Sequence, residues 1–210
     1  MVNCIFTAHC MEMSCDNSCP MLVETSYLLE RNNLNINSPV FYKYPNKIPE
    51  ILKLLEDNEG QFCGYKIEGE MTTIEAADLI TYCAICKNWR GSQLHCTVYN
   101  LRYSKYLDEL KKSWNMKGDS ETVEFMQIWA ESAKVLIISN FDYIKFGDFE
   151  SQTMLNLIQS RQAAGLTTIV VTPPAKNLIS GNSSFASILI DMIRKASGQS
   201  KSPKLLGGVK

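Results

Sequence analysis

The stretch at 135–142 constrains the fold of this chain more than any other. Four consecutive apolar residues, Val-Leu-Ile-Ile at 135–138, are followed by the polar pair Ser139 and Asn140. An apolar run of this length without alternating polar residues is typical of a strand buried on both faces, and such strands occur in parallel sheets covered by helices. We therefore expect an α/β protein built around a central parallel strand.

Strand-like and helix-like patterns alternate along the rest of the chain. Strands are predicted at 61–67, 94–101, 135–139 and 167–172. Helices are predicted at 21–34, 49–59, 74–89, 102–115, 119–132, 148–164 and 183–197. Strands and helices joined by short connections predict a doubly wound parallel sheet.

Composition narrows the class of protein. The chain has 210 residues and a formal net charge of -1, so no strong overall basic field favours nucleic acid. No apolar run is long enough for a membrane span, and the N-terminus lacks the basic and apolar regions of a signal peptide. With 8 cysteines and no export signal, we expect a cytoplasmic protein in a reducing compartment.

Four of the cysteines are clustered at the N-terminus. Cys4, Cys10, Cys15 and Cys19 have the spacing C-x5-C-x4-C-x3-C. Four thiolates in a short segment can hold zinc or an iron–sulfur cluster, with His9 as a substitute ligand, and the metal would supply folding energy that so short a segment lacks. The alternative is four free thiols. We predict a Cys-rich metal-binding module.

The remaining cysteines and histidine favour structural roles. Cys83 and Cys86 form a C-x2-C pair in an apolar helix, where burial in the core is favoured over redox or metal chemistry. Cys63 and Cys96 fit core strands, and His95 has no nucleophile motif beside it.

The strand–turn–helix pattern at 61–89 is the context in which a phosphate-binding loop occurs, but the turn has the wrong composition. Between Glu68 and Thr73 there is one glycine, Gly69, no lysine, and two glutamates that would repel phosphate. At the end of the central strand, the neutral Ser139 and Asn140 cannot supply the charge that magnesium requires. No tight ATP binding is expected.

The helix predicted at 102–115 interleaves basic and aromatic residues. One interpretation is a surface on which a single nucleic-acid strand stacks, with contacts from Arg102, Lys105, Lys111 and Lys112. The other, which we favour, is an amphipathic helix whose aromatic residues face the core and whose lysines are solvated.

The order and spacing of these pieces resemble the DnaC/DnaI/IstB-like AAA+ helicase loaders, and in particular loader-like proteins of phages and mobile elements of low-GC Gram-positive bacteria. Those proteins share a cysteine-rich N-terminus followed by a segment similar to CPMLVETSYLLERNNL at 19–34. The resemblance covers about 60–197. It implies an AAA+/P-loop-like, degenerate domain at 60–197, preceded by the cysteine module at 1–34 and a linker and helix at 35–59, and followed by a flexible tail at 198–210.

The resemblance also implies that the nucleotide machinery of the family is altered here. The family's Lys-Thr pair corresponds to Thr72 and Thr73, and its acidic pair corresponds to Ser139 and Asn140, with Asp142 two residues later. Its sensor Ser-Asn corresponds to Pro173-Pro174, and its arginine finger corresponds to Ile188. Each change removes a component of phosphoryl transfer, so the resemblance implies a pseudo-ATPase.

Three functional hypotheses follow from these patterns. The first is a catalytically inactive adaptor that binds a replicative helicase or an active loader subunit as a hetero-oligomer, or an antagonist of such an assembly. The second is a metal-containing module that binds single-stranded DNA. The third, and least favoured, is an active NTPase in which Asp142, Asp148 or Glu150 holds magnesium.

Overall fold

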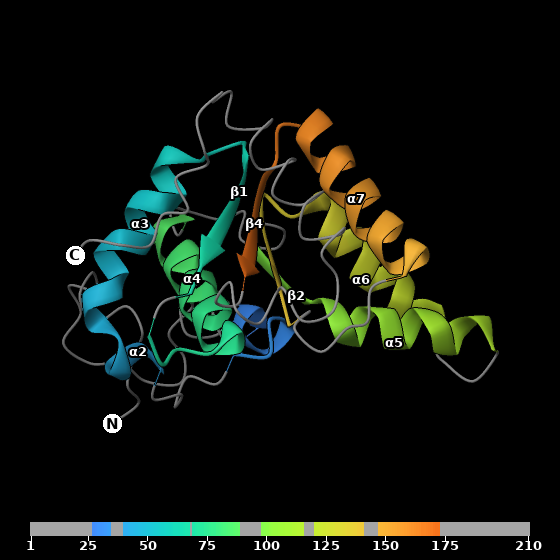
Figure 1. Ribbon diagram of the computed structural model, residues 1–210, viewed down its shortest axis with the longest axis horizontal. Helices are drawn as coiled ribbons and strands as arrows, with labels where there is room; N and C mark the ends of the chain where they lie inside the picture. Colours follow the sequence, from blue (N-terminus) through green and yellow to red (C-terminus); the bar gives the residue numbers. More distant parts are fainter. Residues whose placement is uncertain are drawn as a thin grey trace.

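The computed structural model describes residues 27–34, 40–67, 69–88, 98–115, 120–140 and 147–172. Its centre is a four-stranded parallel sheet with the strand order β1-β4-β3-β2 (Figure 1). The strands are β1 (Phe62–Lys66), β2 (Val98–Arg102), β3 (Val135–Ser139) and β4 (Thr167–Thr172). The predicted α/β parallel sheet is confirmed, and the insertion of β4 between β1 and β3 is consistent with a P-loop-like fold.

The α-helices in the described part of the chain are α2 (Val40–Lys43), α3 (Ile48–Asp57), α4 (Thr73–Asn88), α5 (Tyr103–Trp114), α6 (Ser120–Ser132) and α7 (Asp148–Ala163). A 3-10 turn, η1 (Pro45–Lys47), joins α2 to α3, and residues 27–31 are also helical. The stretch expected as an irregular linker therefore contains two short helical segments. Helices α3 to α7 begin and end within a few residues of their predicted bounds, whereas the helix predicted at 183–197 and the first part of the one predicted at 21–34 lie outside the described residues.

Two hydrophobic cores lie on opposite faces of the sheet. In β3, Val135 and Ile137 pack with α3, α4 and the segment at 27–34, while Leu136 and Ile138 pack with α5, α6 and α7. Figure 1 shows the two helical layers on either side of the strands. All of β3 is buried, as expected for a parallel strand covered by helices on both faces.

The N-terminal segment at 27–34 belongs to the first of these cores. Leu28, Leu29 and Leu34 are buried in the same cluster as residues of α3, α4 and β1. Its Asn32 also covers the outer edge of β2. The Asn100 backbone N–H donates to Asn32 Oδ1 at 2.6 Å, and Asn32 Nδ2 donates to the Val98 carbonyl at 3.4 Å. One carboxamide thus replaces a neighbouring strand and blocks pairing at this position on the edge.

The connection from α7 to β4 shows why the chain turns where it does. Gly165 has a φ of 65°, which favours glycine, and the Leu166 N–H donates to the Arg161 carbonyl at 3.0 Å. This is the Schellman arrangement that ends helices. The carbonyl of Gly165 would lie 3.1 Å from a Cβ at Gly60, so the two turns pack closely.

Arg161 is fully buried and joins α7, α6 and β4. Its guanidinium donates to Thr168 Oγ1 at 2.8 Å and to the carbonyls of Ala130, Glu131 and Thr167 at 2.8, 3.2 and 2.6 Å. Ala130 and Glu131 lie in the last turn of α6, where carbonyls lack helical partners and attract a cation. Burial lowers the pKa of Arg161 to about 10, so it stays protonated at neutral pH.

We expect Arg161→Ala to lower the free energy of unfolding by roughly 3 kcal/mol, because buried carbonyls would lose a charged donor and a cavity would form. Urea denaturation measures this difference. Gln159→Ala, at an exposed position on the same helix, is the matched control and should change stability by less than about 0.5 kcal/mol. Equal stability of the two variants would contradict this role for Arg161.

Candidate functional site

The residues expected at a degenerate nucleotide site lie at one edge of the sheet. All four strands are parallel, so their carboxyl ends lie together, and ligands of such sheets bind outside this edge. Gly69, Thr72 and Thr73 follow β1, whereas Ser139 and Asn140 are at the end of β3. The fold therefore places both halves of the predicted site at the same edge.

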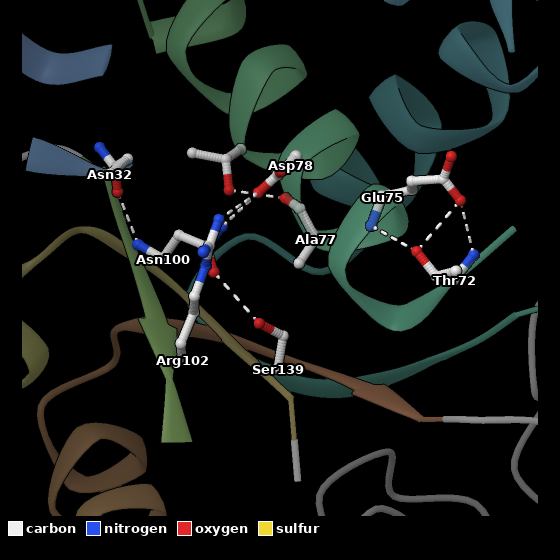
Figure 2. Close-up of polar contacts among 9 residues, drawn as sticks. Asn32, Thr72, Glu75, Ala77, Asp78, Asn100, Arg102 and Ser139 are labelled. Atoms are coloured by element: carbon white, nitrogen blue, oxygen red, sulfur yellow. Dashed lines mark hydrogen bonds and ion pairs between the residues drawn. The ribbon is translucent and has the colours of Figure 1, made fainter. Parts of the chain in front are cut away.

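The N-terminus of α4, where a phosphate would bind, is capped by side chains of the chain itself. The Glu75 N–H donates to Thr72 Oγ1 at 3.1 Å, and Glu75 Oε2 accepts from the Thr72 N–H at 2.9 Å and from the Thr72 hydroxyl at 3.0 Å. Figure 2 shows these reciprocal contacts. They form a capping box, a T-x-x-E pattern at 72–75 that could have been recognised in the sequence.

Glu75 also brings negative charge to this helix end. Its Oε1 accepts from Lys43 Nζ of α2 at 3.1 Å. Partial burial disfavours the ionised form of Glu75, but the hydrogen bonds from Thr72 and the contact with Lys43 outweigh it and lower the pKa of the carboxyl. A helix N-terminus favours negative charge, and the ionised Glu75 carboxylate already occupies this position. A second anion such as phosphate would be repelled there.

The connection between β1 and α4 is anchored to the core. Ile67 and Met71 are buried in the first hydrophobic core, while Gly69 and Glu70 are exposed at the turn. Gly69 has a φ of 76°, and a Cβ added at this residue would meet no atom within 4 Å, so its role is to form the turn. Gly69 is thus explained by backbone conformation.

At the end of β3, the polar pair is used in internal hydrogen bonds. Ser139 is fully buried, and its hydroxyl donates to Asn100 Oδ1 at 3.3 Å. Asn140 has a φ of 57°, and its Nδ2 donates to Ser104 Oγ at 2.7 Å, while its carbonyl accepts from the Ser104 N–H at 3.3 Å. Asn140 therefore holds the first turn of α5 against the end of β3.

Asp78 of α4 is a carboxylate at this edge that the sequence pattern did not identify. Its Oδ1 accepts from Asn100 Nδ2 at 3.0 Å and lies 3.7 Å from Arg102 Nη2 (Figure 2). Asn100 connects it to Ser139 on β3 and to Asn32. The network joins α4, β2, β3 and the segment at 27–34 through one asparagine side chain and its backbone.

The pKa of Asp78 is raised to about 6. Burial is the largest cause and favours the neutral acid, with a smaller contribution from the charge of Glu75. Arg102 and the hydrogen bond from Asn100 act in the opposite direction and stabilise the carboxylate. A perturbed carboxyl group near a predicted site marks Asp78 as a candidate functional residue.

The basic residues predicted to contact nucleic acid are separated by the structure. Arg102 and Lys105 line one cavity. Lys111 instead pairs with Glu150 at 2.8 Å, and Lys112 pairs with Glu109 at 2.7 Å. Tyr103 and Tyr106 from the same helix are buried in the second core, whereas Trp114 is exposed.

Several predicted site residues lie outside the described part of the chain. These are the metal candidates Cys4, Cys10, Cys15 and Cys19, together with Asp142, Pro173-Pro174 and Ile188. Within the described residues, no three His, Cys, Asp or Glu side chains are grouped closely enough to hold a metal ion. Zinc or iron–sulfur binding at the N-terminal cysteines stays a prediction. No helix in the described ranges has the length and apolar character to cross a membrane.

Cys63 and Cys83, predicted as core residues, are buried and form no disulfide, and burial raises the pKa of Cys63 to about 12. A thiol with so high a pKa is a poor nucleophile at neutral pH. This agrees with the core interpretation of these two cysteines.

We expect Thr72→Ala to lower the free energy of unfolding by about 1 kcal/mol, because α4 would lose the side chain that caps its N-terminus. Thr72→Ser keeps the hydroxyl and serves as the control, with a loss of less than about 0.5 kcal/mol. Chemical denaturation measures both values. If the alanine and serine variants had the same stability, the cap would not contribute.

We expect stability to depend on Asp78 and pH together. Because its folded pKa is raised, the carboxyl stabilises the fold below its ordinary pKa of 3.8, and this contribution is lost as pH rises through about 6. Relative to Asp78→Asn, the wild-type protein should therefore lose roughly 2 kcal/mol of unfolding free energy between about pH 4 and about pH 7. A constant difference between the two proteins across this range would contradict the raised pKa.

Known proteins show only limited similarity to this chain. No family model matches this sequence, and no curated protein sequence matches it. The crystal structure of the DnaC helicase loader is similar to this chain with a TM-score of 0.46 and 11% sequence identity, covering 80% of this chain and 89% of that chain.

Proposed function

We propose that this protein is a nucleotide-independent adaptor built on a P-loop-like scaffold, and that it binds a replicative helicase or an active helicase-loader subunit. The reciprocal Thr72–Glu75 cap at the start of α4 is the observation that carries the first part of the proposal. The partner class comes from the resemblance to helicase loaders in the order of sequence elements.

The α4 cap supports the absence of ATP turnover because it changes both the geometry and the charge of the phosphate position. A phosphate-binding helix needs free N–H groups and a nearby cation. Here the Glu75 carboxylate accepts a hydrogen bond from the Thr72 N–H and forms an ion pair with Lys43. The ammonium of Lys43 is therefore already paired with a carboxylate. A bound phosphate would have to displace a carboxylate that is already paired.

The end of β3 supports the same conclusion through a different requirement. Magnesium in nucleotide sites is held by carboxylate and hydroxyl oxygens. Ser139 is buried, and its hydroxyl is bonded to Asn100, while the Asn140 amide is bonded to Ser104. Both side chains therefore stabilise the packing of the scaffold, and neither supplies charge.

An adaptor also needs a surface for its partner. Trp114 at the end of α5 and Phe149 at the start of α7 form an edge-to-face pair with ring centroids 4.8 Å apart, and they are 59% and 38% exposed. Exposed aromatic residues are enriched where proteins bind one another. We include this aromatic pair in the surface that contacts the partner.

The proposal predicts no magnesium-dependent ATP binding at millimolar nucleotide and no ATP hydrolysis. Calorimetry with Mg–ATP, together with a phosphate-release assay, measures both. Magnesium-dependent hydrolysis that is lost in Asp142→Asn would contradict the proposal and establish an active NTPase.

The adaptor role predicts that the purified protein captures a replicative helicase or helicase loader to the same extent with ATP and with a chelator. Trp114→Ala should weaken this capture at least about fivefold, as expected for an exposed aromatic contact, whereas Gln159→Ala should not. Recovery of neither partner would contradict the role. A helicase-loading assay then distinguishes an adaptor, which supports loading, from an antagonist, which blocks it.

A further inference from the structure

A cavity of about 250 Å³ lies beside β2, away from the capped start of α4. Its walls come from the segment at 27–34, from β2, from the first turn of α5 and from α6. The residues that define its chemistry are Arg31, Tyr99, Arg102, Lys105, Phe125 and Trp129. The adaptor role proposed above does not use this cavity.

Among the described residues, three cations line the cavity and no carboxylate does. Arg102 has its nearest acidic partner, Asp78, at 3.7 Å, which is long for an ion pair, and its buried Nε has no hydrogen-bond partner among the described residues. Lys105 is exposed and takes part in none of the ion pairs within the described ranges. In a chain with a net charge of -1, this is a local site for an anion.

Aromatic side chains also line the cavity. The Phe125 and Trp129 rings are stacked, with centroids 5.9 Å apart and an interplanar angle of 26°, and Trp129 meets Tyr99 edge to face at 5.7 Å. The guanidinium of Arg31 lies 4.4 Å from the centre of the Trp129 ring. Trp129 is therefore held by neighbours, while Phe125 is 52% exposed and offers its ring to a ligand.

The start of α5 adds positive potential to the cationic side. Arg102 occupies the position before the helix, and no side chain caps this helix end. The helix N-terminus attracts negative charge, although its Ser104 N–H already donates to the Asn140 carbonyl at 3.3 Å. Arg102 directly precedes the first turn of α5, and Lys105 lies within it. The cations and the aromatic rings therefore favour a ligand that is anionic at one end and planar at the other.

We propose that this cavity binds one nucleotide unit, with its phosphate at Arg102 and Lys105 and its base stacked on Phe125. Bases stack on aromatic side chains when they are unpaired, and guanidinium and ammonium groups bind the phosphates. A duplex keeps its bases stacked internally, so it cannot make this contact. The nucleotide belongs either to a single strand or to the free pool, and the proposal is independent of the adaptor role.

The test measures the fluorescence anisotropy of a labelled oligothymidylate titrated with the full-length protein in low-salt buffer without magnesium. Phe125→Ala should weaken binding about tenfold, because the base would lose its stacking surface. Ile128→Ala is the matched control, since Ile128 is also exposed on α6 but does not line the cavity. It should change the affinity less than about twofold.

A second pair of variants tests the phosphate contact. Lys105→Ala should weaken binding about fivefold and reduce the salt dependence of the affinity. Lys112→Ala removes a cation from the same helix outside the cavity and should have less than half that effect. Both positions are exposed, and thermal denaturation of each variant shows that the fold is kept.

Competition identifies the source of the nucleotide. Displacement of the oligothymidylate by thymidine monophosphate at the same nucleotide concentration would assign the cavity to a free nucleotide, and resistance would assign it to a single strand. Either result supports the site if the two variant pairs differ as stated. Absence of binding, equal effects of the control variants, or equal competition by polyglutamate would overturn the proposal, the last by pointing to an acidic protein segment.

Discussion

Burial of β3 on both faces is the constraint on which the rest of the described structure depends. Successive side chains of β3 point to opposite faces of the sheet, and all four at 135–138 are apolar. One helical layer would bury only half of them, so one core forms on each side of the sheet. Covering both faces requires crossover connections, and crossovers keep the strands parallel. Parallel strands place all their carboxyl ends at one edge, and this is why α4, α5 and the ends of β2 and β3 meet there.

The same edge of the sheet carries a connected network of polar groups. The polar groups at the ends of β2 and β3 are joined through Asn100, whose side chain contacts Asp78 and Ser139 and whose backbone contacts Asn32. A buried polar group without a partner costs free energy, so each member of this network makes the others less costly to bury. Burial within this network raises the pKa of Asp78 to about 6.

Two helix ends on this fold illustrate opposite electrostatic solutions. The start of α4 is closed by Thr72 and Glu75, so its positive end is neutralised within the chain. The start of α5 has no side-chain cap, although its Ser104 N–H donates to the Asn140 carbonyl, and Arg102 and Lys105 at this helix end line a cationic cavity. The two helix ends therefore differ in the charge of the side chains around them.

The sequence by itself determined the parallel α/β sheet, because periodicity and apolar run length report directly which faces of an element are buried. It also determined that the turn at 68–73 has no lysine and that the neutral Ser139 and Asn140 follow the central strand, since this depends only on residue type. Only the tertiary structure decided that Glu75 meets Lys43, that Asp78 meets Asn100 and Arg102, and that Arg31 lies over Trp129. The tertiary structure also decided that Lys105 lines a cavity, whereas Lys111 and Lys112 pair with Glu150 and Glu109. These contacts join residues far apart in the chain, and their distances and burial depend on how the helices pack against the sheet.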